Sequence, residues 1–135
     1  MDQFGNGVER GTVVAQEIQG PYGKIAIEEG VIATISGVAA TECYGLVGMA
    51  PRNIQEGLSD LLRRENYERG VDIQFNEDSI SIQLYIVVEY GVKISEVARN
   101  VQERVKYAVE SLLGLKVDRI NVKVQGVRVT RPTRK

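Results

Sequence analysis

The stretch VDIQFNEDSISIQLYIVVEY, residues 71–90, decides the fold class of this chain. Apolar and polar residues alternate on both sides of the polar turn sequence at 76–78. Alternation with a period of two is typical of strands, and two such runs around a short polar turn predict a β-hairpin. The second run also carries Tyr85 and Val87 on its opposite face, so we expect its far half to be covered on both faces.

A long amphipathic helix is predicted downstream of the hairpin, over residues 94–113, because apolar residues recur there at helical spacing. Gly114 followed by Leu115 is the pattern of a glycine C-cap with its hydrophobic contact. A last strand begins near Ile120. Its apolar phase slips by one residue at Gly126, which predicts a β-bulge.

Two further helices are predicted upstream, one from Glu28 to about Cys43 and one from Asn53 to Gly70. The first has an apolar stripe made of Val31, Ile32, Ile35, Val38 and Ala39. With a short strand over 24–27, the order becomes strand-helix-helix-strand-strand-helix-strand. This order predicts an α+β fold, a two-layer domain with a mainly antiparallel sheet.

The chain is expected to have one domain, over residues 22–130. Residues 1–21 are polar and rich in glycine, which predicts a flexible N-terminal arm, although 13–18 could form a short strand. Residues 131–135 form a basic tail that we expect to be mobile.

Composition excludes several classes of protein. The 135 residues include 17 Lys and Arg against 18 Asp and Glu, so a net charge of −1 provides no general attraction to nucleic acid or to an anionic membrane. Residues 30–51 are the nearest approach to a membrane span, but Glu42 lies near the middle of a weakly apolar segment. The N-terminus lacks the apolar run of a secretory signal. We therefore expect a soluble, cytoplasmic protein with no membrane span of its own.

Catalytic and metal-binding residues are scarce. The chain has no histidine, the commonest general base and metal ligand, and no phosphate-binding glycine motif. Cys43 is the only cysteine, which excludes an intrachain disulfide, and it has no imidazole to activate it. We expect no enzyme activity, no cofactor and no metal site.

The segment CYGLVGM, residues 43–49, is unusually apolar for a turn between two helices. Three interpretations remain open: a buried turn, a loop that binds a membrane or a partner, and a KH-like clamp for RNA, since GLVG has the form G-x-x-G. The clamp fits poorly because no basic residue lies between the glycines. For the partner-binding loop we expect Met49 to pack inward and Leu46 or Val47 to be exposed. The candidate partner-binding residues are Tyr44, Leu46, Val47 and Arg52.

Positive charge gathers only near the C-terminus. If the protein meets RNA or another anionic surface, the candidate residues are Arg128, Arg131, Arg134 and Lys135.

Residues 22–130 resemble the alkaline shock protein family of Gram-positive bacteria, also called envelope stress response proteins. The resemblance depends on GLVGM at 45–49, VKISEVARNVQ at 92–102 and NVKVQGV at 121–127. It implies a small, cytoplasmic, non-catalytic protein of the envelope stress response or of fatty-acid-linked envelope homeostasis. Some members self-associate, and some gather at the inner membrane face through a membrane-anchored partner, so the resemblance implies that this chain can do the same. The resemblance assigns no catalytic residues to this chain.

Overall fold

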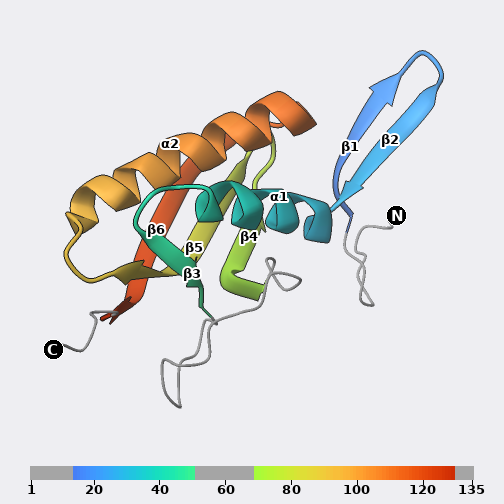
Figure 1. Ribbon diagram of the computed structural model, residues 1–135. Helices are drawn as coiled ribbons and strands as arrows, with labels where there is room; N and C mark the ends of the chain where they lie inside the picture. Colours follow the sequence, from blue (N-terminus) through green and yellow to red (C-terminus); the bar gives the residue numbers. More distant parts are fainter. Residues whose placement is uncertain (1–13, 51–68, 130–135) are drawn as a thin grey trace, which may run out of the picture.

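The computed structural model describes residues 14–50 and 69–129 (Figure 1). The predicted hairpin is confirmed, and its second strand organises the sheet. β4 (Val71–Phe75) pairs antiparallel with the first half of β5 (Ile80–Glu89), and β3 (Leu46–Met49) pairs antiparallel with the second half. β6 (Val117–Arg128) follows β5 along its whole length. Because β6 occupies one edge of β5, β3 and β4 share the other edge.

The β5–β6 pairing is parallel, whereas the other strand pairings in the described residues are antiparallel. The physical reason is the connection between them: α2 (Ile94–Leu113) returns the chain to the starting end of β5. The predicted bulge is confirmed. Ile86 pairs with Val124 and the next residue of β5, Val87, pairs with Gly126, so Gln125 is the extra residue.

Two helices cover one face of the sheet, which confirms the two-layer α+β architecture (Figure 1). α1 spans Glu29–Thr41, and α2 has the bounds that the sequence predicts. The glycine C-cap of α2 is also confirmed. Gly114 is left-handed with φ 70°, its N–H donates to the carbonyl of Glu110 at 3.1 Å, and Leu115 is buried.

The core lies between α2 and the inner face of β5. Alternate residues of β5 meet the apolar stripe of α2, and burial of each such side chain contributes about 1.5–3 kcal/mol. The fully buried side chains at this contact are Ile80, Ile82, Leu84, Ile86, Val88, Val101, Val105 and Val109. Val87, on the opposite face of β5, is also buried, so the far half of this strand is covered on both faces as expected.

The apolar stripe predicted for α1 is partly wrong. Val31 is 45% exposed, whereas Ala33, Gly37 and Ala40 on the small-residue face are buried. The reason is that α1 packs against α2 as well as against the sheet, and small side chains allow that close approach. Ser36, also buried, donates its hydroxyl to the carbonyl of Ile32 at 2.8 Å.

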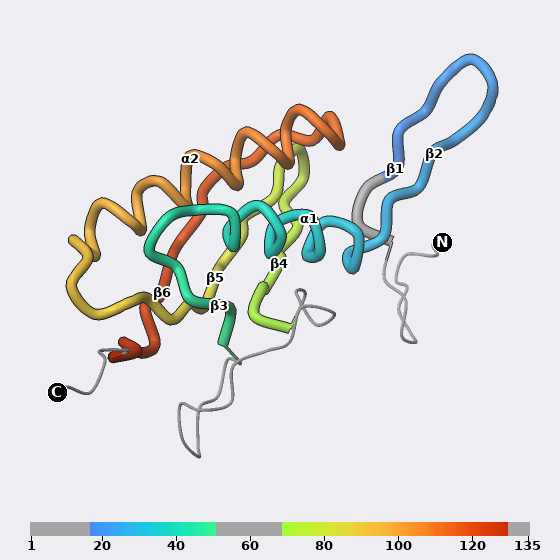
Figure 2. The backbone as a smooth tube through the Cα atoms, viewed as in Figure 1, coloured from blue at the N-terminus to red at the C-terminus, as the bar shows by residue number. Residues whose placement is uncertain are grey.

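A separate hairpin precedes α1. β1 (Val14–Gly20) pairs antiparallel with β2 (Gly23–Glu28), and Figure 2 shows the pair standing away from the rest of the molecule. The short strand expected at 13–18 is therefore confirmed. The boundary that we expected between arm and domain falls in the turn of this hairpin, at Pro21-Tyr22.

The helix expected from Asn53 to Gly70 lies almost entirely outside the described residues. Neither helix in the described part of the chain combines the length and the apolar character that crossing a membrane requires.

Candidate interaction surface

The chain turns sharply between α1 and β3, at residues 42–45, which we call the corner segment. Gly45 has φ 92°, a left-handed conformation that favours glycine, and its carbonyl accepts a hydrogen bond from the N–H of Glu89 at 2.9 Å. A Cβ at Gly45 would lie 2.8 Å from Cγ2 of Val97. The corner segment is therefore pressed against the first turns of α2, and only glycine fits at its end.

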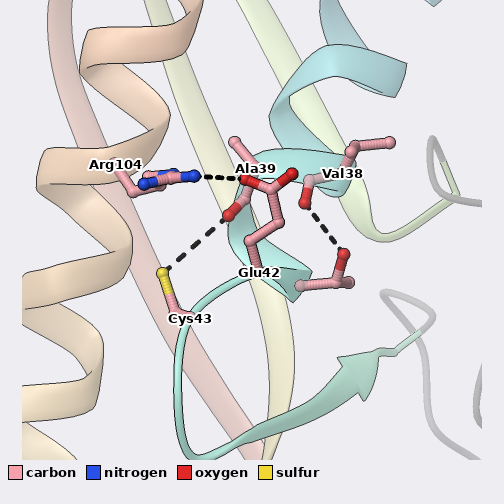
Figure 3. A network of polar contacts seen from close by, with 6 residues as sticks. Val38, Ala39, Glu42, Cys43 and Arg104 are labelled. Atoms are coloured by element: carbon pink, nitrogen blue, oxygen red, sulfur yellow. Dashed lines mark hydrogen bonds and ion pairs between the residues drawn. The ribbon is translucent and has the colours of Figure 1, made fainter.

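An ion pair joins the corner segment to the middle of α2 (Figure 3). A guanidinium nitrogen of Arg104 lies 2.6 Å from Oε1 of Glu42, the residue that caps α1. Both side chains are about half exposed, at 53% and 49%, so water screens the pair and its net contribution to stability is small. Its role is to hold the orientation of two surface side chains.

A groove lies beside this ion pair, with a volume of about 380 Å³, and we call it the corner groove. Two strongly exposed tyrosines, Tyr44 at 86% and Tyr107 at 72%, line it. The remaining lining residues are Glu42, Cys43, Asn100, Glu103 and Arg104. Aromatic residues and arginine are enriched at the centres of protein interfaces, so the composition is that of a binding surface.

A second, smaller hollow of about 280 Å³ lies next to the corner groove, and Tyr44 lines both. Leu46, Val47 and Val92 give it an apolar lining, and Glu89 stands at its edge. Tyr44 thus stands between the corner groove and this apolar hollow, and a partner that covers Tyr44 would contact both.

Cys43 is a poor nucleophile. Burial raises the pKa of its thiol, and this outweighs the opposing effect of Arg104, so the thiol stays protonated near neutral pH. Its Sγ lies 3.8 Å from the carbonyl oxygen of Ala39, to which it donates (Figure 3). Cys43 completes the end of α1 and supplies no evident chemistry to the groove.

The structure corrects our expectation for the GLVG segment. It is not a turn between helices, because Leu46–Met49 forms β3 and Gly48 is buried and paired with Val87. A KH-like clamp requires a free glycine loop, so this interpretation of the segment is wrong. The sequence signal for β3 was weak because a strand of four residues is too short to show a recognisable alternation of apolar and polar residues.

The predicted partner-binding residues have different environments. Tyr44 is exposed and Met49 is buried at 2% exposure, as expected. Leu46 and Val47 are half-buried rather than substantially exposed, because pairing of β3 with β5 brings Leu46 against the core. Arg52 lies outside the described residues.

The predicted anionic-surface residues lie mostly outside the described part of the chain. Arg128 is exposed at the end of β6, where its carbonyl accepts a hydrogen bond from the N–H of Tyr90 at 2.9 Å. Arg131, Arg134 and Lys135 lie outside the described residues.

Sequence reasoning missed the contribution of α2 to the corner groove. Asn100, Glu103, Arg104 and Tyr107 follow the spacing i, i+3, i+4, i+7, so they form one stripe on the helix. The sequence signal that could have indicated this surface is Tyr107, an aromatic residue in an otherwise polar and charged stripe. Tyr44 lies across the groove from Tyr107 but far from it in the sequence, so the proximity of the two tyrosines could not be inferred from the sequence.

The face of the sheet away from the two helices carries a wider and more polar hollow, of about 800 Å³. Its charges are mixed, with Asp72 and Asp118 beside Arg119, and it lacks an exposed aromatic anchor. Among residues 14–50 and 69–129, no group of His, Cys, Asp and Glu side chains is placed to hold a metal ion. The corner groove is therefore the better candidate for recognition.

Comparison with known proteins gives a consistent assignment. Residues 17–129 match the model of the ASP23 family, described as having a cell envelope-related function. The uncharacterized protein YloU of Bacillus subtilis (strain 168) is 53% identical, and the match covers 86% of this chain and 98% of that protein. A stress response regulator gls24 homolog of Streptococcus pyogenes serotype M3 is 24% identical over 78% of this chain and 59% of its own length. A solved MamM CTD is 14% identical with a TM-score of 0.43, covering 75% of this chain and 95% of that one, and bears on neither function nor partners.

Proposed function

This chain belongs to the alkaline shock protein family, which has a cell envelope-related function, and we propose that it acts there as a non-catalytic interaction protein. In this proposal it self-associates in the cytoplasm and binds a membrane-anchored protein at the inner face of the membrane during envelope stress. The name of a stress response regulator homologue among its relatives supports the link to stress.

The exposed tyrosine pair at the corner groove is the observation that carries the proposal. Tyr44 and Tyr107 come from different elements, and the Glu42–Arg104 ion pair joins those elements beside them. Tyrosine offers a large contact area with only two side-chain torsions, so it loses little entropy on binding and favours recognition of a protein surface.

Affinity capture from the native bacterium tests this function. The tagged protein should recover a membrane-anchored protein, and Tyr44→Ala with Tyr107→Ala should reduce recovery at least about tenfold, which corresponds to losing a typical interface anchor. Leu112→Ala is the control, because Leu112 is a comparably exposed apolar side chain near the C-terminal end of α2 and does not line the corner groove. Recovery of the same protein by all variants would exclude the corner groove as the binding site.

Self-association is tested separately by sedimentation velocity from micromolar to near-millimolar protein. We expect the mean sedimentation coefficient to rise with concentration. A monomer across this whole range would refute the self-association part of the proposal.

A further inference from the structure

The hairpin formed by β1 and β2 has an apolar face without a cover in the described residues. Ile18 pairs with Ile25 across the hairpin, and these side chains are 37% and 59% exposed. Ile27 continues the same face toward the body, where it packs against the core. Figure 2 shows the hairpin projecting from the body, and a two-stranded hairpin that is alone in water is only marginally stable.

The opposite face of the hairpin is charged. Lys24 lies 3.7 Å from Glu17 across the two strands, and Glu28 follows on the same face of β2. The outer edge of β2 has no strand beside it in the described part of the chain, since β1 and β2 form a two-stranded sheet of their own. Such an edge is a template for another strand.

β2 is complementary to a second copy of itself. In an antiparallel pair centred on Ala26, Lys24 of each copy lies opposite Glu28 of the other, and Ile25 lies opposite Ile27. Two-fold symmetry repeats both matches. Centring the pair on Ile25 would place Lys24 opposite Ala26, and centring it on Ile27 would place Ile25 opposite Glu29. Only the register centred on Ala26 pairs the charges and the isoleucines together.

We propose that β2 pairs antiparallel with β2 of a second copy of this chain, with the two Ala26 residues at the two-fold axis. The result is a four-stranded sheet shared by two copies, with isoleucines gathered on one face. This inference rests on the self-association that we propose above and assigns a surface to it.

Two observations favour this arrangement over others. β1, with the sequence VAQEIQG, has no basic residue, so pairing β1 with itself would add no ion pair between the two copies. An anionic membrane is also a poor occupant, because Glu17 and Glu28 outnumber Lys24 on the hairpin and would be repelled by it.

Charge reversal tests the register. Lys24→Glu and Glu28→Lys each place like charges opposite one another twice, and each should raise the dimer Kd about tenfold by sedimentation velocity. The double variant Lys24→Glu with Glu28→Lys restores opposite charges and should return the Kd to the wild-type value. An equimolar mixture of the two single variants should also associate like wild type, since positions 24 and 28 then match between different chains.

Two controls separate pairing from damage to the hairpin. Glu17→Gln removes the Lys24–Glu17 contact within one copy and should leave association unchanged. Lys24 and Glu28 are exposed, so circular dichroism should be the same for every variant. Only the variants with Glu28→Lys should melt slightly lower, because Glu28 is the residue that caps the N-terminus of α1 and a positive charge is unfavourable there. In a Cys43→Ser background, Ala26→Cys should form an intermolecular disulfide on oxidation, whereas Gln19→Cys, also exposed but on β1, should not.

The outcomes distinguish this inference from the proposed function. Association that survives both single reversals would overturn the hairpin pairing and leave the proposed self-association intact. Failure of the double variant and of the mixture to recover would overturn the register. A wild-type protein that stays monomeric would overturn both.

Discussion

Arg104 and Glu42 are 62 positions apart in the sequence, yet their charged groups approach to 2.6 Å and join α2 to the end of α1. Because both side chains are half exposed, this ion pair orients the corner groove more than it stabilises the fold.

The weak contribution of this ion pair to stability leads to a first prediction. Arg104→Gln should leave the melting temperature nearly unchanged while reducing capture of the membrane-anchored partner. A large loss of thermal stability would instead give the pair a structural role.

Gly45→Ala should destabilise the protein by about 2 kcal/mol or more, because it adds backbone strain and a methyl group against Val97. Gly91→Ala is the matched control. Gly91 also has a positive φ, of 104°, but its added Cβ would meet nothing within 4 Å, so only the strain remains. Urea denaturation of both variants measures the difference. Equal losses would mean that the corner segment does not press on α2.

Gly114→Val should cost more than about 1 kcal/mol, because a β-branched residue is strained in the left-handed conformation that ends α2. Gly114→Asn should cost less, since asparagine tolerates this conformation better. Thermal unfolding of the two variants gives the comparison. Wild-type stability in the valine variant would show that the cap of α2 can rearrange without cost.

The thiol of Cys43 should make stability depend on alkaline pH. Burial raises its pKa in the folded state above the ordinary value of 9.0, so the folded protein keeps this proton after the unfolded chain has lost it. The contribution is complete below pH 9 and is lost as the pH rises through the folded pKa. The stability difference between wild type and Cys43→Ala should therefore be smaller at about pH 10 than at about pH 7.5, as measured by chemical denaturation. A constant difference would mean that the folded thiol titrates normally.

Any binding to RNA or to anionic vesicles should depend on the basic C-terminus. Truncation after Val129 removes Arg131, Arg134 and Lys135 while keeping β6 whole, and it should abolish binding. Binding by the full chain should also weaken steeply as the salt concentration rises, because the basic residues would displace counterions from the anionic surface. Salt-resistant binding by the truncated protein would require a different surface.

The two described helices and the central hairpin could be predicted because their signals are local. Residues 94–113 repeat at helical spacing over many turns, and residues 71–88 alternate on both sides of a turn. Gly114 and Gly126 also indicated their roles locally, one as a helix cap and one beside a bulge. The candidate site was predicted only in part, since Tyr44 was recognised and Tyr107 was not.

Local sequence patterns were enough to predict the elements with strong periodicity, the order of those elements and the two-layer class. Tertiary structure alone decided that β3 is a strand, that β6 lies parallel to β5, and that Tyr44 and Tyr107 line one groove. The physical reason is the range of the interactions. Periodicity reports which face of one segment is buried, whereas strand pairing and surface geometry depend on which distant segment becomes its neighbour, and packing of the whole chain decides that.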